Sequence, residues 1–153
     1  MPDIARILKA DTPLTLARVA RGSQPLVLAD LARAAKGRAV FIVPDDSAMH
    51  AVSEAARYFA PELEVIEFPA WDSLPYDRAS PALSISARRL AALHRLQAGK
   101  PGAQLLVTTA NAVLQRVLTP FRIRESVREF APGMEIGRDS LAALLQRQGY
   151  SRT

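Results

Sequence analysis

The sequence contains no cysteine and only two histidines, and these absences exclude several kinds of site. Without cysteine there is no disulfide bond and no zinc site built from thiolates. The histidines, His50 and His94, lie far apart in the chain and leave little from which to build a metal centre. With 7 glycines and 11 prolines, the composition is also unlike that of fibrous or disordered chains. We therefore expect a folded protein that holds neither a metal ion nor a cofactor.

The sequence also lacks a segment that could enter a membrane. No apolar run approaches the roughly 18 residues that a spanning helix needs. The amino-terminal segment MPDIARILKADT carries Asp3 and Asp11 and contains no apolar stretch of the kind found in secretion signals. We therefore expect a cytoplasmic protein.

The material that is present is sufficient for one compact domain, or for one domain and part of a second. The chain has 153 residues, of which 49% are hydrophobic, so a substantial core can form. Its net charge is +5, from 20 basic and 15 acidic residues. A basic excess favours nucleic-acid or acidic partners, but the basic residues are scattered along the chain. The charge by itself therefore assigns no function.

Segments typical of strands alternate with segments typical of helices over most of the chain. The strands that we expect are Thr15–Ala20, Arg38–Val43, Leu63–Phe68 and Gln104–Thr109. The helices that we expect are Pro25–Ala35, Ala48–Phe59, Ile85–Gln97 and Asn111–Leu118. The second strand, RAVFIV, is a nearly continuous β-branched and aromatic run, which is typical of a strand covered on both faces. The alternation predicts βαβ units, and hence an α/β fold with a parallel sheet flanked by helices.

The pattern changes near the carboxyl end of the sequence. The segment FRIRESVREF, Phe121–Phe130, alternates with period two, as expected for a strand with one exposed side. A helix is expected after it, beginning at a cap formed by Asp139 or Ser140 and reaching Gln148. A strand at 121–130 would have an exposed edge, which is a site where two chains can associate.

This change predicts two domains. The first, at 1–120, carries the alternating strands and helices. The second, at 121–153, contains only the first strand and helix of a small α+β domain, so we interpret it as the incomplete beginning of that domain.

A glycine turn lies where a nucleotide-binding protein carries its phosphate loop, between the first expected strand and the first expected helix. The turn reads RGSQPL, and Gly22 and Ser23 keep small residues at two positions of the pattern G-x-x-x-x-G-K-[ST]. Three residues replace the second glycine, the lysine and the hydroxyl residue of that pattern: Gln24, Pro25 and Leu26. We therefore predict a degenerate phosphate loop, and we expect the chain to bind no nucleotide cofactor and to catalyse no reaction.

Two aspartates end the second expected strand, in VFIVPDD, and allow two interpretations. Asp45 or Asp46 could hold a magnesium ion, because carboxylates are the ligands that this ion prefers. The favoured interpretation is that these aspartates cap the next helix. An enzymatic alternative, an NTPase with a non-standard site near Gly22 and Asp45, would need Lys36 or Lys100 to supply the missing base or lysine.

A proline-rich loop, FPAWDSLPYDRASP, follows the third expected strand and carries two aromatic residues, Trp71 and Tyr76. Beside Arg78, these rings could stack on nucleic-acid bases. We favour the alternative in which they fold back over the end of the sheet. A second functional alternative is a nucleic-acid-binding domain that uses scattered arginines: Arg88, Arg89, Arg95 and Arg116.

The same loop and the helix after it, FPAWDSLPYDRASPALSISARRLAALHRL, resemble a region of the bacterial transcription-repair coupling factors, the Mfd family. Four other segments fall in the order and spacing of that family's amino-terminal region: GSQPLVLADLA, VFIVPDDSAMHAV, LLVTTANAVLQRVLTP and GMEIGRDSLAALLQRQGYSRT. The resemblance extends from about Leu14 to the end of the sequence. The loop residues that carry it are Trp71, Asp72, Leu74, Pro75, Tyr76, Asp77 and Pro81.

This resemblance implies that 1–120 is a RecA-like domain similar to domain 1a of the excision-repair protein UvrB, with an inactive phosphate loop. The span between Tyr76 and Ile85 is too short for the hairpin with which UvrB meets damaged DNA. In the full-length family member, an ATP-dependent DNA translocase, this region would help to recruit UvrA and to restrain the motor. The implied partners are UvrA, RNA polymerase and double-stranded DNA, with weak or no DNA binding by this chain and no membrane. The UvrA-contacting residues of the family are expected beyond Thr153.

Overall fold

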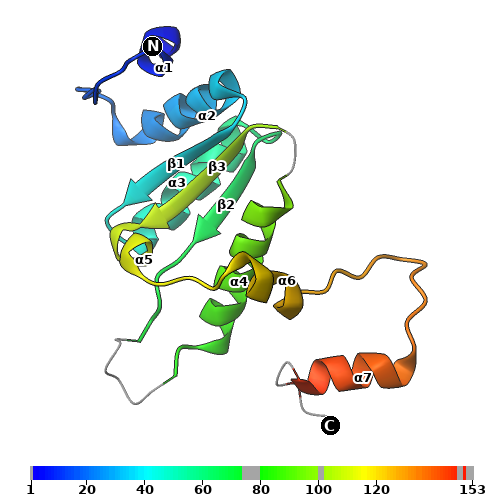
Figure 1. The fold of residues 1–153 in the computed structure, drawn as a ribbon. Helices are drawn as coiled ribbons and strands as arrows, with labels where there is room; N and C mark the ends of the chain where they lie inside the picture. The colour runs from blue at the N-terminus through cyan, green and yellow to red at the C-terminus, as the bar shows by residue number, and fades with distance from the viewer. Residues whose placement is uncertain (1, 74–79, 100–101, 148–149, 151–153) are drawn as a thin grey trace. The chain divides into compact units, whose positions relative to one another are not determined.

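The computed structural model describes residues 2–73, 80–99, 102–147 and 150 (Figure 1). The chain divides into two compact units, Met1–Val117 and Leu118–Thr153. The first unit carries the sheet. Within the described residues, every helix is too short or too polar to cross a membrane.

The first unit is built on a parallel sheet of three strands. They are β1 (Arg38–Val43), β2 (Glu64–Phe68) and β3 (Gln104–Thr109), and they lie in the order β1-β3-β2. The predicted parallel sheet is therefore confirmed, and its central strand is the last of the three in the sequence.

Helices cover the sheet on both faces. The helices of the first unit are α1 (Ile4–Leu8), the short 3-10 helix η1 (Arg21–Ser23), α2 (Gln24–Ala35), α3 (Asp46–Phe59), α4 (Leu83–Ala98) and α5 (Ala110–Leu114), and of these α2, α3 and α4 pack on the faces of the sheet. Helices α2 and α3 pack on one face, and α4 packs on the other, mainly against β2 (Figure 1). Three of the predicted helices are confirmed with shifted ends, whereas the fourth ends at Leu114 instead of Leu118.

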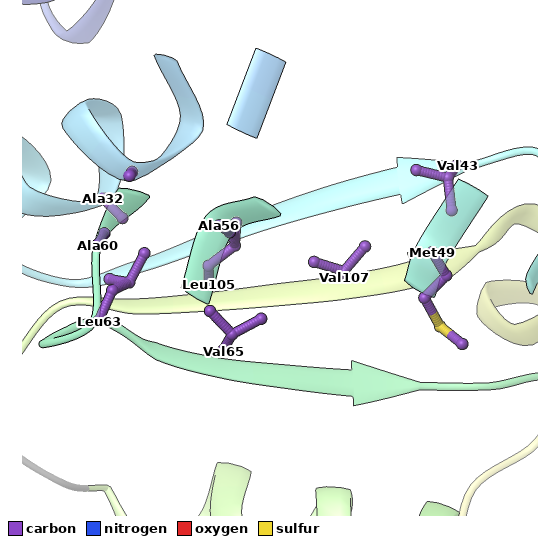
Figure 2. Packing of buried hydrophobic residues seen from close by; sticks show 10 residues of the cluster. Ala32, Val43, Met49, Ala56, Ala60, Leu63, Val65, Leu105 and Val107 are labelled. Atoms are coloured by element: carbon purple, nitrogen blue, oxygen red, sulfur yellow. The ribbon is translucent and has the colours of Figure 1, made fainter. Parts of the chain in front are cut away.

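Two apolar clusters hold the first unit together, one on each face of the sheet. On the α3 side, Leu105 and Val107 of β3 belong to the same buried cluster as Met49 (Figure 2). On the α4 side, Ile66 of β2 packs with Ala92. Successive residues of a strand point to opposite faces, and each large apolar side chain that is fully buried contributes about 1.5–3 kcal/mol. The run of apolar residues in β2 and β3 therefore supplies both clusters.

A polar row crosses the sheet where its strands begin. Arg38, Gln104 and Glu64 are the first residues of β1, β3 and β2, and they stand in register. Arg38 donates through Nε and Nη2 to Gln104 Oε1, at 3.0 and 2.8 Å, and Gln104 Nε2 donates to Glu64 Oε2 at 2.7 Å. Because a slip of one residue would turn every side chain of a strand to the opposite face, this row and the two cores favour the same register.

Two expectations about strands in the first unit are wrong. Thr15–Ala20 forms no strand, and within it Arg18 adopts a left-handed conformation with φ of 62°, which interrupts an extended chain. Strand β1 is therefore the edge of the described sheet and is not covered on both faces. Its Val40 and Ile42 side chains are 55% and 52% exposed.

The second unit differs more from its predicted structure. Its described residues form two helices, α6 (Pro120–Ser126) and α7 (Arg138–Arg147), and no strand. The strand expected at Phe121–Phe130 is wrong, because Thr119 accepts a hydrogen bond from the backbone N–H of Arg122 and starts a helix with proline in its first turn. Helix α7 matches the second expected helix, whose predicted end at Gln148 lies outside the described residues.

Candidate functional site at the carboxyl end of the sheet

The glycine turn is the entry to a helix and has no glycine-dependent geometry. Residues Arg21–Ser23 form the 3-10 helix η1, closed by a hydrogen bond from Ser23 N–H to the carbonyl of Ala20 at 2.9 Å, and η1 runs directly into α2. Gly22 does not adopt a positive φ, and no neighbouring atom lies within 4 Å of the position that a Cβ would occupy. Neither backbone conformation nor close approach therefore requires glycine in this turn.

An open hollow of about 720 Å³ lies between this turn, the end of β1 and the start of α3. Gly22, Gln24 and Pro25 line it, whereas Ser23 and Leu26 line a separate hollow beside residues 15–20. The five predicted loop positions are thus divided between two surfaces. Among the described residues that line the larger hollow, Arg21 is the cation and Asp45 the carboxylate, and none is a lysine.

Asp45 is used to cap α3. Its Oδ1 accepts a hydrogen bond from the backbone N–H of Ala48 at 2.8 Å, which satisfies one of the unpaired donors at the start of that helix. The capping interpretation is confirmed for Asp45, while Asp46 lies in the first turn of α3. The enzymatic alternative is weakened further, because Lys36 ends α2, a helix of 12 residues that is about 18 Å long. Lys100 lies outside the described residues.

A buried arginine organises the proline-rich loop at the end of β2. The guanidinium carbon of Arg89 lies 4.2 Å from the ring centroid of Phe68 and 4.3 Å from that of Trp71. Arg89 is only 2% exposed. Aromatic rings attract a cation placed over their faces, and the attraction increases when water is excluded. Trp71 therefore lies against the end of β2 through Arg89.

Hydrogen bonds also hold Arg89 and Trp71 in place. Arg89 Nη1 donates to the Pro69 carbonyl at 2.5 Å and to Gln115 Oε1 at 3.0 Å, and the backbone N–H of Trp71 donates to that Gln115 oxygen at 2.9 Å. Across the loop, the Asp72 carboxylate accepts from the backbone N–H of Ala82 at 3.1 and 3.3 Å. The loop is therefore tied at both ends. Half-buried Pro81 lies at one of them, and four further loop residues lie outside the described residues: Leu74, Pro75, Tyr76 and Asp77.

Burial lowers the pKa of Arg89, because a charged guanidinium loses solvation inside the protein. Within the described part of the chain, Arg89 makes no ion pair with a carboxylate. Two rings and two oxygen acceptors surround the cation instead. This role of Arg89 was not predicted from the sequence, although the residue precedes Ala92, Leu93 and Leu96 at helical spacing on the buried side of α4.

Of the other three arginines proposed for nucleic-acid binding, Arg88 and Arg95 are engaged with carboxylates, whereas Arg116 makes no ion pair with a described carboxylate. Arg88 Nη2 lies 3.0 Å from Glu67 Oε2, and Arg95 Nε lies 3.0 Å from Glu64 Oε1. Glu67 also binds Arg57 at 3.0 Å. Arg88 and Arg95 would have to leave a carboxylate before they could bind phosphate, so the nucleic-acid alternative loses support for these two residues.

Known proteins supply an independent comparison. No protein-family model matches the chain. The chain is 31% identical over 111 residues to the transcription-repair-coupling factor of Haemophilus influenzae, 28% over 114 residues to that of Escherichia coli and 33% over 128 residues to that of Myxococcus xanthus. These matches cover 72%, 74% and 78% of this chain. The chain spans only about a tenth of each relative, since it covers 9% of the first and 10% of the others.

Proposed function

We propose, from the premise that this chain is a relative of the transcription-repair coupling factors, that it is a non-catalytic module acting in transcription-coupled nucleotide excision repair. The observation that carries the proposal is sequence similarity to proteins of that name over about three quarters of the chain. The resemblance drawn from the proline-rich loop and the comparisons agree on this family.

The second part of the proposal is that the sheet and its helices are a RecA-like domain whose phosphate loop is degenerate. The position of the hollow supports this idea, because nucleotides bind at the carboxyl ends of parallel strands. Its lining supports the proposed lack of activity, since Pro25 stands where the phosphate-loop pattern has lysine and Asp45 is engaged in a helix cap. A site that lacks the lysine, and whose carboxylate is already hydrogen-bonded, is without the groups that bind the phosphates and the magnesium ion of a nucleotide.

The third part concerns partners. In the full-length protein this module would help to recruit UvrA and to restrain a DNA-translocating motor, while RNA polymerase and double-stranded DNA are bound elsewhere. The paired arginines of α4 support weak or no DNA binding by the module itself. We place the main UvrA contacts beyond Thr153.

Titration of this chain with ATP and magnesium by calorimetry tests the degenerate loop. We expect no binding heat, and we expect none for the Asp45→Asn variant, which keeps the cap and changes the charge. Clear micromolar binding, lost in Asp45→Asn, would favour the NTPase alternative.

A pull-down with purified UvrA tests the partner. We expect a chain extended by about 80 residues, enough for a small domain, to retain UvrA much better than the chain of 153 residues. Equal retention would show that the main contacts lie within the present chain. Failure of both chains to bind would contradict the recruiting role.

A further inference from the structure

One side chain joins two parts of the first unit that lie far apart in the sequence. Gln115 follows helix α5, and its Oε1 accepts hydrogen bonds from the backbone N–H of Trp71 at 2.9 Å and from Arg89 Nη1 at 3.0 Å. The first donor lies in the loop after β2, and the second lies in α4. The acceptor lies just before Val117, where the first unit ends. Gln115 therefore ties the loop after β2 to the segment by which the chain leaves the first unit.

The segment that Gln115 holds has few other interactions to keep it in place. Helix α5 has 5 residues, and helices shorter than about 12 residues are marginal in water unless they are packed against a partner. Ala112 is the residue of α5 that is buried, and an alanine side chain offers little apolar area. The two hydrogen bonds of Gln115 therefore supply a large part of the tertiary attachment of α5 and of the residues after it.

The two donors to Gln115 depend on one another. The guanidinium of Arg89 lies between the rings of Phe68 and Trp71, with its central carbon 4.2 and 4.3 Å from their centroids. Displacement of Trp71 would remove its own N–H from Gln115 and would also remove one of the rings that hold Arg89 in position. Both hydrogen bonds to Gln115 would therefore weaken together, as expected for a connected polar network.

We propose that Trp71, Arg89 and Gln115 form a latch that couples the loop after β2 to the end of the first unit. In the latched state, which the structure shows, Gln115 holds α5 against the rest of the unit. When Trp71 is displaced, Gln115 is released, and the segment from α5 to Val117 opens locally while the sheet stays folded. A ligand that moves Trp71 would thus loosen this segment without touching it. Coupling of this kind is reciprocal, so release of Gln115 also loosens Trp71.

Tryptic digestion of the folded chain measures release of the latch. Arg116 is exposed and directly follows Gln115, and the rate of cleavage after it follows the population of the locally open form. We expect Gln115→Ala to raise this rate about 5- to 30-fold, because both hydrogen bonds are lost. Cleavage after Arg57, which lies within α3, requires unfolding of the first unit and serves as the internal reference for global stability.

Two control variants separate the latch from a general loss of stability. Gln115→Glu keeps the acceptor and places a carboxylate beside Arg89, so it should be cleaved as slowly after Arg116 as the unchanged chain. Asp45→Ala removes the cap of α3 and should not raise cleavage after Arg116 relative to cleavage after Arg57. The proposal is overturned if Gln115→Ala leaves this ratio unchanged, or if Gln115→Glu and Asp45→Ala raise it as much as Gln115→Ala does.

Reciprocity gives a second test at the other end of the latch. Trp71→Ala should accelerate cleavage after Arg116 relative to Arg57, although the two positions are far apart in the sequence. In Gln115→Ala, the emission of Trp71, the single tryptophan of the chain, should shift to longer wavelength. The fluorescence measurement leaves Trp71 unchanged, so it decides the question even if circular dichroism shows that Trp71→Ala is unfolded. Unchanged emission in Gln115→Ala, or unchanged cleavage in a folded Trp71→Ala chain, would contradict the coupling.

Discussion

Arg89 is a buried cation stabilised by rings and neutral oxygens, with no carboxylate in contact among the described residues. Isolated charges are costly to bury, so this arrangement depends on the planar guanidinium lying between Phe68 and Trp71. Lysine carries the same charge but lacks the planar group that stacks on aromatic faces. The identity of the residue should therefore matter as much as its charge.

We expect Arg89→Lys to lower the free energy of unfolding by about 1–3 kcal/mol. Urea denaturation followed by fluorescence measures this, because Trp71 is the single tryptophan of the chain. The native emission should also shift to longer wavelength as the indole loses its cover. Arg88→Lys is the matched control, since its exposed ion pair with Glu67 should change stability by less than about 1 kcal/mol. Equal effects of the two substitutions would contradict the stacked role of Arg89.

Gly22 offers a second test at the scale of one residue. Because Gly22 has no positive φ and a Cβ would meet nothing within 4 Å, we expect Gly22→Ala to leave stability unchanged or raise it by about 0.5 kcal/mol. Gly99 ends α4 with φ of 56°, so Gly99→Ala should lose about 1 kcal/mol. Thermal melts of both variants make the comparison. A loss in Gly22→Ala as large as in Gly99→Ala would show that the turn does require glycine.

At the scale of the element, the local pattern of apolar residues predicted the strands and helices that pack together in the first unit. Strands β1 and β3 have the predicted bounds, because β-branched residues suit a pleated, packed surface. The strand predicted at Thr15–Ala20 does not form, because Arg18 interrupts the extended backbone and no strand in the described part of the chain pairs with this segment. At Phe121–Phe130 the apolar residues alternate with period two, which predicted a strand. Thr119 and Pro120 instead start helix α6 at the beginning of this segment.

The interactions at the candidate site were less predictable than the elements. The cap at Asp45 could be predicted, since it joins residues three positions apart. The contacts of Trp71 with Arg89 and Gln115 join residues that are distant in the sequence. No local pattern predicts them, because only the packing of α4 and α5 on the sheet brings them together.

The cap of α3 gives a prediction at this scale. Asp45→Ala should cost about 1 kcal/mol of stability, because it removes the acceptor for the backbone N–H of Ala48. Asp45→Asn keeps an acceptor at the same place and should retain most of that stability. Chemical denaturation distinguishes the variants, and equal losses would indicate that the charge of Asp45 matters and not its hydrogen bond.

A second prediction concerns the contact between α2 and the turn before β2. Hydrogen bonds from its own backbone and from the Arg33 side chain lower the pKa of the Glu62 carboxyl. The ionised Glu62 carboxyl therefore adds a small amount to the free energy of unfolding. This contribution is fully present above the ordinary pKa of glutamate, and it is lost as the pH falls through the lowered pKa of Glu62. Glu62→Gln should flatten the dependence of the urea midpoint on pH in that acidic window. The exposed Glu54→Gln is the control, and an identical pH dependence in both variants would contradict this role.

At the scale of the whole molecule, both buried clusters consist of residues before Val117. We therefore expect a chain shortened to 1–117 to unfold cooperatively, with a midpoint temperature within about 8 °C of that of the full chain. Calorimetry of the two chains checks this. A shortened chain without a cooperative transition would show that the second unit is required for the first to fold.

The order of the strands has a consequence for how the chain folds as it is synthesised. Among the residues that the structure describes, strands β1 and β2 pair only with β3, which lies between them and follows both in the sequence. No strand pair can therefore form until residue 109 has left the ribosome, although α2 and α3 are complete long before. Until then β1 exposes both edges, a period in which a chaperone could protect it. Nascent chains arrested with β3 inside the exit tunnel should accordingly be digested rapidly by protease, and those arrested after its release should resist. Because the central strand is the last of the three to be synthesised, the sheet can form only after β1, β2 and the helices between them have been translated.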